Sequence, residues 1–143
     1  MDKQAFELKF MQEFPPEFLR AARGLYLENG WIDENASPDF PRNAFAGSFL
    51  VAAAFAPGGR LAGVGRSLSD GVSDAYIQDV MTAKEFRRRG VGKLVTCALA
   101  EELKRRGIDW IGLVGVPGTE QFYAGCGLKS APGHTLWLAE EER

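Results

Sequence analysis

The residues best suited to chemistry lie in the segment RRRGVG, Arg87 to Gly92, where three cations precede two glycines that are separated by one residue. Glycine has no Cβ, so a ligand can lie directly against its backbone, and positive φ angles are open to it. If a helix begins here, four N–H groups lack internal partners and the helix dipole adds about half a positive charge. The segment therefore predicts an anion site, with phosphate as its natural ligand.

Charge and spacing narrow the choice of phosphate ligand. The three arginines and Lys93 suit a pyrophosphate better than a single carboxylate. A dinucleotide fingerprint needs a third glycine where Val95 stands, and a Walker loop needs a glycine where Arg87 stands, so both standard nucleotide loops are absent. A solvated basic helix start, with glycines that serve only as turns, is the alternative interpretation of the same residues.

Few other side chains are suited to acid–base or nucleophilic chemistry. Asp79, in YIQDVMT, is a candidate general base, although it could equally be an edge-strand carboxylate or an anion that binds an amine. Ser67 lacks the closing glycine of a nucleophile elbow, and His134 is the only histidine, which leaves little scope for a triad. Cys97 and Cys126 are too few and too far apart to indicate a disulfide framework or a metal pair. We therefore interpret Cys126 as a small packing residue and expect no metal.

The first half of the chain is expected to form an antiparallel meander. Apolar and charged residues alternate over 6–10, as in a half-buried strand, and a helical period follows over 16–30. Two apolar runs joined by PGG predict a hairpin over 49–68, and AYIQDVMT predicts the next strand. The stretch 31–47 is rich in Pro, Asn and Asp, and is typical of a loop with room for a short helix.

The second half is expected to contain a strand–helix–strand unit. Apolar residues from Val91 to Leu103 recur at three- and four-residue spacings, and Gly107 ends the helix that they define. IDWIGLVGV is nearly all apolar, as in a central strand that is covered on both faces and paired in parallel. TEQFYAG predicts a short helix, and a terminal hairpin over 128–138 follows, which could pair across a homodimer.

Length, composition and charge indicate a single domain over residues 1–143. A chain of 143 residues is long enough to bury about two-thirds of its unfolded surface. We expect a cytoplasmic protein without a membrane partner, because the chain has neither a long apolar run nor a secretion signal. The net charge of −2 gives no long-range field for nucleic acid, so we expect no nucleic-acid partner.

The pattern Arg87-x-x-Gly90-x-Gly92, between an apolar strand and a helix, resembles the coenzyme A signature of the GNAT superfamily of N-acetyltransferases. The expected order of elements from Phe6 to Leu138 is that family's order over nearly the whole chain. FYAGCGLK is similar to the family's F-Y-x-x-x-G-F segment, with Leu128 in place of the usual aromatic residue. The resemblance implies an α/β (α+β) fold with a mixed, mostly antiparallel central sheet, helices on both faces and a splayed pair of central strands.

The resemblance also implies roles for particular residues. Val80, Met81 and Thr82 would present backbone groups to pantetheine and to the acetyl carbonyl of acetyl-CoA. Tyr123 matches the residue that commonly protonates the departing coenzyme A sulfur. The pyrophosphate would be bound by the arginine–glycine segment and the residue after it, namely Arg87, Arg88, Arg89, Gly90, Val91, Gly92 and Lys93.

These observations lead us to expect an acetyl-CoA-dependent N-acetyltransferase that acts by direct attack of a primary amine in a ternary complex. A small-molecule amine is the favoured acceptor. Only about one amine in a thousand is neutral at pH 7, so a base such as Asp79 is needed to take a proton. Full proton transfer from Tyr123 to a thiolate is uphill by roughly 2 kcal/mol, so Tyr123 could act by hydrogen bonding alone. The alternatives are a protein N-terminus or lysine as acceptor, and a non-catalytic coenzyme A or acyl-CoA sensor of the same fold.

Overall fold

Five strands form one mixed sheet within residues 5–116 and 118–140, the part of the chain that the computed structural model describes. The strands follow one another in the sheet in chain order: β1 (Glu7–Phe10), β2 (Leu50–Phe55), β3 (Leu61–Ser69), β4 (Asp74–Thr82) and β5 (Trp110–Gly112). The first four pair antiparallel, whereas β4 and β5 are parallel. The predicted meander and the strand–helix–strand unit are both confirmed.

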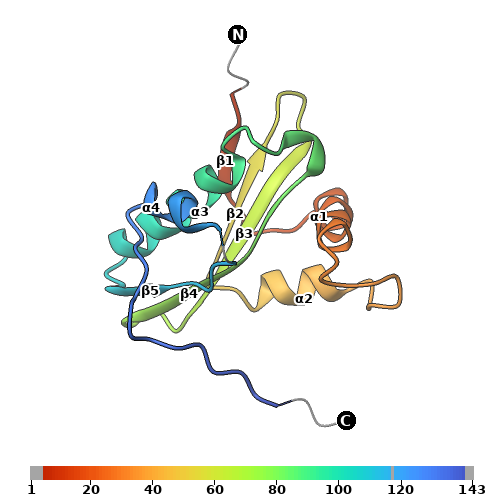
Figure 1. Ribbon diagram of the computed structural model, residues 1–143. Coiled ribbons are helices and arrows are strands. Elements are labelled where there is room, and N and C mark those ends of the chain that lie inside the picture. The colour runs from red at the N-terminus through yellow and green to blue at the C-terminus, as the bar shows by residue number, and fades with distance from the viewer. Residues whose placement is uncertain (1–4, 117, 141–143) are drawn as a thin grey trace.

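Helices cover both faces of this sheet (Figure 1). The helices α1 (Pro16–Glu28) and α2 (Phe40–Ala46) lie on one face, and α3 (Val91–Arg105) and α4 (Glu120–Ala124) lie on the other. A short 3₁₀ helix, η1 (Lys84–Phe86), connects β4 to α3. The predicted fold class is therefore confirmed, as is the short helix within the 31–47 stretch. No helix in the described ranges has the length and apolar character that a membrane crossing requires.

The helix α3 packs unusually closely on the sheet because β3 presents glycines to it. A Cβ at Gly63 would lie 2.5 Å from Cγ1 of Val91 and 2.9 Å from the carbonyl oxygen of Met81. A Cβ at Gly65 would lie 2.8 Å from Cγ1 of Val95. Real side chains do not approach this closely, so a bare backbone at both positions sets the distance between α3 and β3. The start of α3 is thereby held beside the end of β4.

The chain after α3 departs from two predictions. The strand β5 has three residues and lies at the edge of the described sheet, where Trp110 is 60% exposed. It is therefore not a central strand covered on both faces, because no described strand pairs along its outer side. The apolar composition of IDWIGLVGV does not distinguish a central strand from an edge strand, because it does not show whether a further strand follows.

The prediction of a terminal hairpin over 128–138 is also wrong, because residues 128–140 contain no strand and Trp137 is 86% exposed. The first arm of that hairpin, before the APGH turn, would be only LKS, which has one apolar residue and offers no apolar face for pairing. The TLWL run therefore has no partner strand in the described chain.

Because α3 packs closely on β3, the addition of one methyl group to a glycine of β3 should lower the stability of the fold. Gly63→Ala should lower the free energy of unfolding by about 1–3 kcal/mol, because its Cβ meets a backbone oxygen as well as Val91. Gly24→Ala is the matched control: its Cβ meets nothing within 4 Å in α1, so helix propensity should raise stability by up to about 1 kcal/mol. Urea unfolding measures both variants, and equal stability of the two would contradict the packing argument.

Candidate functional site

The start of α3 offers unpaired backbone N–H groups to an external anion. Gly90 occupies the N-cap position with a φ of 81°, and no side chain caps the helix. Among the described residues, the amides of Gly90, Val91, Gly92 and Lys93 have no acceptor. A Cβ at Gly90 would meet nothing within 4 Å, so this side of the turn is open. The arrangement meets the condition for anion binding at a helix start.

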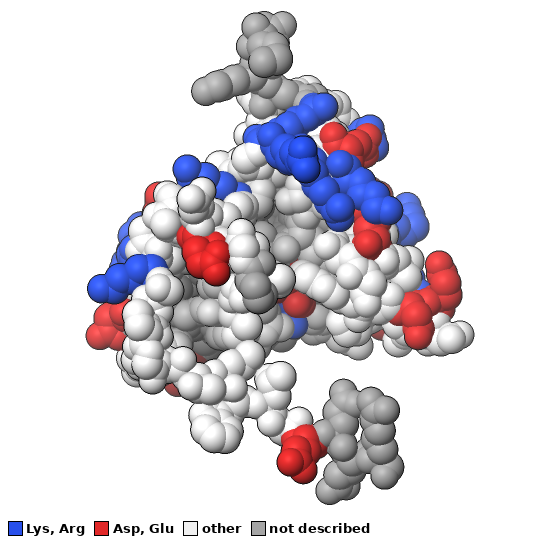
Figure 2. Space-filling view, viewed as in Figure 1, with Lys and Arg blue, Asp and Glu red and all other residues white. Residues whose placement is uncertain are grey.

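Basic side chains surround this turn. The three arginines at 87–89 and Lys93 are all exposed, and Figure 2 shows basic groups gathered where β4 passes into α3, with a hollowed surface beside them. The guanidinium of Arg89 lies over the ring of Phe86, 5.8 Å from its centroid. Arg88 has a φ of 63°, a left-handed conformation that is rare outside glycine and that costs roughly 1–3 kcal/mol. Such strain marks this turn as a candidate binding element.

The strand β5 ends before β4 reaches the helix start. The two strands pair only over three positions, from Asp74 with Trp110 to Tyr76 with Gly112. Beyond Tyr76, the rest of β4 has no β5 partner among the described residues. Val80 and Thr82 lie in the half of β4 that has no β5 partner, and both are half-buried. The edge of β4 can therefore offer backbone groups to a ligand in the gap.

A β-bulge interrupts the pairing of β4 with β3, in the half of β4 that β5 does not pair. Val64 pairs with Met81 and Arg66 pairs with Gln78, so two residues of β4, Asp79 and Val80, oppose the single residue Gly65. Asp79 has a φ of 55°, the left-handed conformation often found in a bulge. A bulge bends its strand and increases the local twist, so β4 changes direction beyond the residues that β5 pairs.

The carboxylate of Asp79 is held by two donors on the α1 side of the sheet. Its Oδ2 accepts hydrogen bonds from the hydroxyl of Tyr26 at 2.7 Å and from Nε of Arg66 at 2.8 Å. The side chains of Arg66 and Asp79 are only 12% and 21% exposed, so the ion pair is largely shielded from water. Burial raises the pKa of Tyr26, and the hydrogen bond to Asp79 and its charge raise this pKa further, so the phenol stays a donor. Asp79 is thus anchored, with Oδ1 as its remaining oxygen.

Tyr123 approaches the gap from the other side, on α4. Burial is the main cause that raises the pKa of Tyr123, and the nearby Tyr76 adds to it. Since Tyr76 forms the last pair between β4 and β5, Tyr123 lies near the point where the strands part. The preceding Phe122 reaches the helix start: a Cβ at Gly92 would lie 2.9 Å from its ring. The structure thus places α4 next to both ends of the predicted site.

Sequence reasoning missed three features near this site. Tyr26 and Arg66 emerge as the partners of Asp79, although the predicted meander does place the strand of Arg66 beside the strand of Asp79. The interpretation of Cys126 as an unpaired packing residue is wrong, because Cys97 and Cys126 form a disulfide with Cα atoms 4.8 Å apart. The sequence separation of 29 gave no signal of pairing, since only the contact of α4 with α3 makes the cysteines neighbours. In the described ranges, no three His, Cys, Asp or Glu side chains gather as metal ligands.

A mixed sheet whose parallel pair β4 and β5 ends short of an open helix start defines an acyltransferase architecture. The chain belongs to the acetyltransferase (GNAT) family, whose sequence model matches residues 8–128. The resemblance noted from the sequence is confirmed. Members of this family generally use acetyl-CoA as the acyl donor. No curated protein sequence matches the chain.

Solved structures support the same fold. A putative acetyltransferase from Deinococcus radiodurans is 20% identical, with a TM-score of 0.75 over 96% of this chain and 91% of that one. A GNAT family protein from Streptococcus pneumoniae is 20% identical, with a TM-score of 0.74 over 96% and 100%. A glucosamine-6-phosphate N-acetyltransferase from Arabidopsis thaliana is 16% identical, with a TM-score of 0.69 over 96% and 99%. At these identities, the likeness establishes the fold.

The shielded network around Asp79 predicts a stability effect that does not depend on catalysis. Asp79→Asn should lower the free energy of unfolding by about 1–3 kcal/mol, because Arg66 loses its charge partner. Tyr26→Phe should cost about 1 kcal/mol, and a double-mutant cycle should show coupling between the two positions. Glu13→Gln is the control, since Glu13 is exposed. If Asp79→Asn is no less stable than Glu13→Gln, the carboxylate does not anchor the bulge.

Proposed function

We propose that the protein transfers an acetyl group from acetyl-CoA to a primary amine by direct attack in a ternary complex, with a small-molecule amine as the acceptor. The observation that supports this proposal most directly is the open start of α3 beside the half of β4 that β5 does not pair. The amides and cations at the start of α3 suit a pyrophosphate. The edge of β4 that β5 does not pair suits an extended chain that ends in a thioester.

In this proposal, the first turn of α3 binds the diphosphate of the donor. The amides from Gly90 to Lys93 donate to its oxygens, and the cations at 87–89 add charge at the rim. Gly92 contributes by lacking a side chain, because a Cβ there would occupy the space between Phe122 and the hydroxyl of Thr82. The backbone of Val80, Met81 and Thr82 then directs the pantetheine arm along the gap. An amide of that strand would stabilise the oxyanion.

Tyr123 would assist the departing sulfur. Its raised pKa keeps the phenol protonated at neutral pH, so it can donate a hydrogen bond to the thiolate as this forms. The same shift makes complete proton transfer less favourable than it is for an unperturbed tyrosine. Hydrogen bonding to the sulfur is therefore the role that we assign to Tyr123.

Asp79 would assist the amine through its unused oxygen, directly or through a water molecule. Oδ2 is occupied by Tyr26 and Arg66, which leaves Oδ1 for this contact. The pairing with Arg66 fixes the carboxylate beside the bulge, where Oδ1 could contact an ammonium group or receive a proton from it. We therefore keep both roles for Asp79, as a binding anion and as the proton acceptor.

The anchored state of Asp79 also favours one alternative, a coenzyme A or acyl-CoA sensor that binds but does not turn over. Its Oδ2 is engaged by Tyr26 and Arg66, so Asp79 can serve as a structural anchor without taking part in turnover. Release of coenzyme A across a panel of small amines, protein N-termini and lysine peptides separates the two functions. Clear binding of acetyl-CoA with no release in any mixture would favour the sensor.

Binding of the donor provides the first test. Gly90→Glu should weaken acetyl-CoA binding at least about tenfold, because it places a like charge at the predicted diphosphate site. Gly58→Glu is a matched control: both glycines have positive φ and open space around them, but Gly58 lies in the β2–β3 turn. Calorimetric titration measures both variants, and equal affinities would remove the diphosphate assignment.

The pH dependence of turnover tests Tyr123. The pKa of Tyr123 is raised above that of a free tyrosine, so turnover should rise with pH as the amine loses its proton and should fall only at a pH above the range in which a free tyrosine ionises. Tyr123→Phe should lower kcat about 10²-fold and should abolish the alkaline fall. A rate profile that is unchanged in this variant would show that Tyr123 only packs.

A further inference from the structure

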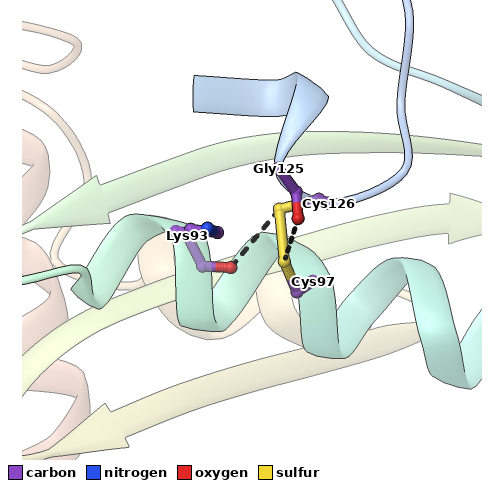
Figure 3. The surroundings of a disulfide bond; sticks show 4 residues. All are labelled: Lys93, Cys97, Gly125 and Cys126. Carbon is purple, nitrogen blue, oxygen red and sulfur yellow. Dashed lines mark hydrogen bonds between the residues drawn. A yellow bond between two sulfur atoms is a disulfide. The ribbon is translucent and has the colours of Figure 1, made fainter. Parts of the chain in front are cut away.

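Two cysteines join the helix of the candidate site to the segment that carries Tyr123. Cys97 lies on α3, and Cys126 follows the end of α4, which lies against α3 (Figure 3). From this arrangement, we infer that Cys97–Cys126 is a reversible oxidation site, whose disulfide fixes α4 on α3 and whose reduction by a dithiol releases α4. The consequence for catalysis rests on the proposed function, whereas the redox chemistry and the release of α4 do not.

The disulfide is the strongest attachment of α4. This helix has five residues, and none of them is buried. Within the described chain, the hydrogen bonds of residues 119–128 have both partners in residues 116–128. The contacts of the two sulfur atoms are the exceptions. The remaining attachments are packing contacts, of Phe122 near Gly92 and of Lys93 near Gly125. A segment with so few attachments opens readily when its covalent link is cut.

Two backbone carbonyls lie near the sulfur atoms, one on each side of the contact between α3 and α4. Sγ of Cys126 lies 3.5 Å from the carbonyl oxygen of Lys93, and Sγ of Cys97 lies 3.9 Å from the carbonyl oxygen of Gly125 (Figure 3). A disulfide has no hydrogen to donate, so neither contact is a hydrogen bond in the oxidised protein. Each carbonyl lies across the contact between α3 and the segment that follows α4, so release of α4 leaves both thiols to water.

Reduction proceeds by thiol–disulfide exchange. Cys97 is partly exposed and Cys126 is buried, so the thiolate of a small dithiol attacks the sulfur of Cys97. The S–S bond breaks, its electron pair leaves with the sulfur of Cys126, and that sulfur takes a proton. The second thiolate of the reductant then attacks the mixed disulfide and releases Cys97, which is protonated in turn. Two electrons and two protons pass to the protein, and the dithiol becomes a cyclic disulfide.

Release of α4 would affect the part of the site near Tyr123, where the thioester is proposed to lie, more than the first turn of α3, where the diphosphate is proposed to bind. Tyr123 is three residues from Cys126, so it moves with the released segment. The amides at Gly90 belong to α3, which the core holds in place through Val91 and Val95. Phe122 of α4 packs near Gly92, so the reduced protein should lose some affinity for acetyl-CoA, but its kcat should fall by a larger factor.

Thiol alkylation followed by peptide mass spectrometry tests the oxidation site. The air-oxidised protein should show no free thiol, dithiothreitol should expose both cysteines in the folded protein, and oxidised glutathione should restore the cross-linked peptide. Alkylation of both cysteines without a reductant would overturn the proposal. So would a disulfide that dithiothreitol reduces only after the protein is unfolded.

Hydrogen exchange tests the release of α4 without any reference to activity. Reduction should remove protection from residues 119–128 and should leave α1 unchanged. Cys97→Ser should exchange like the reduced protein and should not respond to dithiothreitol. If this variant does not fold, the reduced wild-type protein gives the same comparison. Identical exchange of residues 119–128 in the oxidised and reduced wild-type protein would overturn the release of α4.

Turnover measured in both states separates this inference from the proposed function. A lower kcat after reduction in the wild-type protein, with no response in Cys97→Ser, supports the complete proposal. If exchange responds but kcat does not, control of catalysis is overturned. If no amine is acetylated in either state, the proposed function fails, while alkylation and exchange still decide whether the disulfide holds α4.

Discussion

The unpaired N–H groups at the first turn of α3 are the feature on which the surrounding structure depends. Amides without an acceptor are tolerated only where water or a ligand can reach them, so this turn must stay open. The positive φ at position 90 favours glycine, a Cβ at position 92 would meet the ring of Phe122, and the basic rim offsets the charge of an incoming anion. The glycines of β3 matter for the same reason, because they let α3 lie close enough to bring this turn to the end of β4.

At the Asp79 bulge, the hydrogen bonds that the carboxylate accepts offset the free-energy cost of its left-handed backbone conformation. A left-handed conformation at an aspartate costs roughly 1–2 kcal/mol. Hydrogen bonds that involve a charged group contribute about 1.5–3 kcal/mol each, and Asp79 accepts two of them. The network therefore outweighs the strain and fixes the bulge. A proton on Asp79 would weaken the same network, so any role as a base opposes its role as an anchor.

Sequence alone predicts those parts of the fold that have a strong local period. The amphipathic spacing of α3 and the turn between β2 and β3 each specify one structure, and both are found. The edge position of β5 and the unpaired 128–140 segment depend on whether a partner strand exists, which composition does not encode. The partners of Asp79 depend on a bulge that shifts the register by one residue, and the disulfide depends on the docking of α4.

The two sides of the candidate site differ in rigidity, and this difference follows from how each is held. The start of α3 is fixed by buried residues from Val91 onwards, whereas α4 has no buried residue and a mainly local hydrogen-bond network. A binding element for a diphosphate benefits from a fixed geometry, because its donors then need no rearrangement. A side chain that meets a leaving group must also let the product depart, which favours a segment that can open. A covalent link between α3 and α4 therefore sets how far the mobile side can open while the rigid side is unaffected.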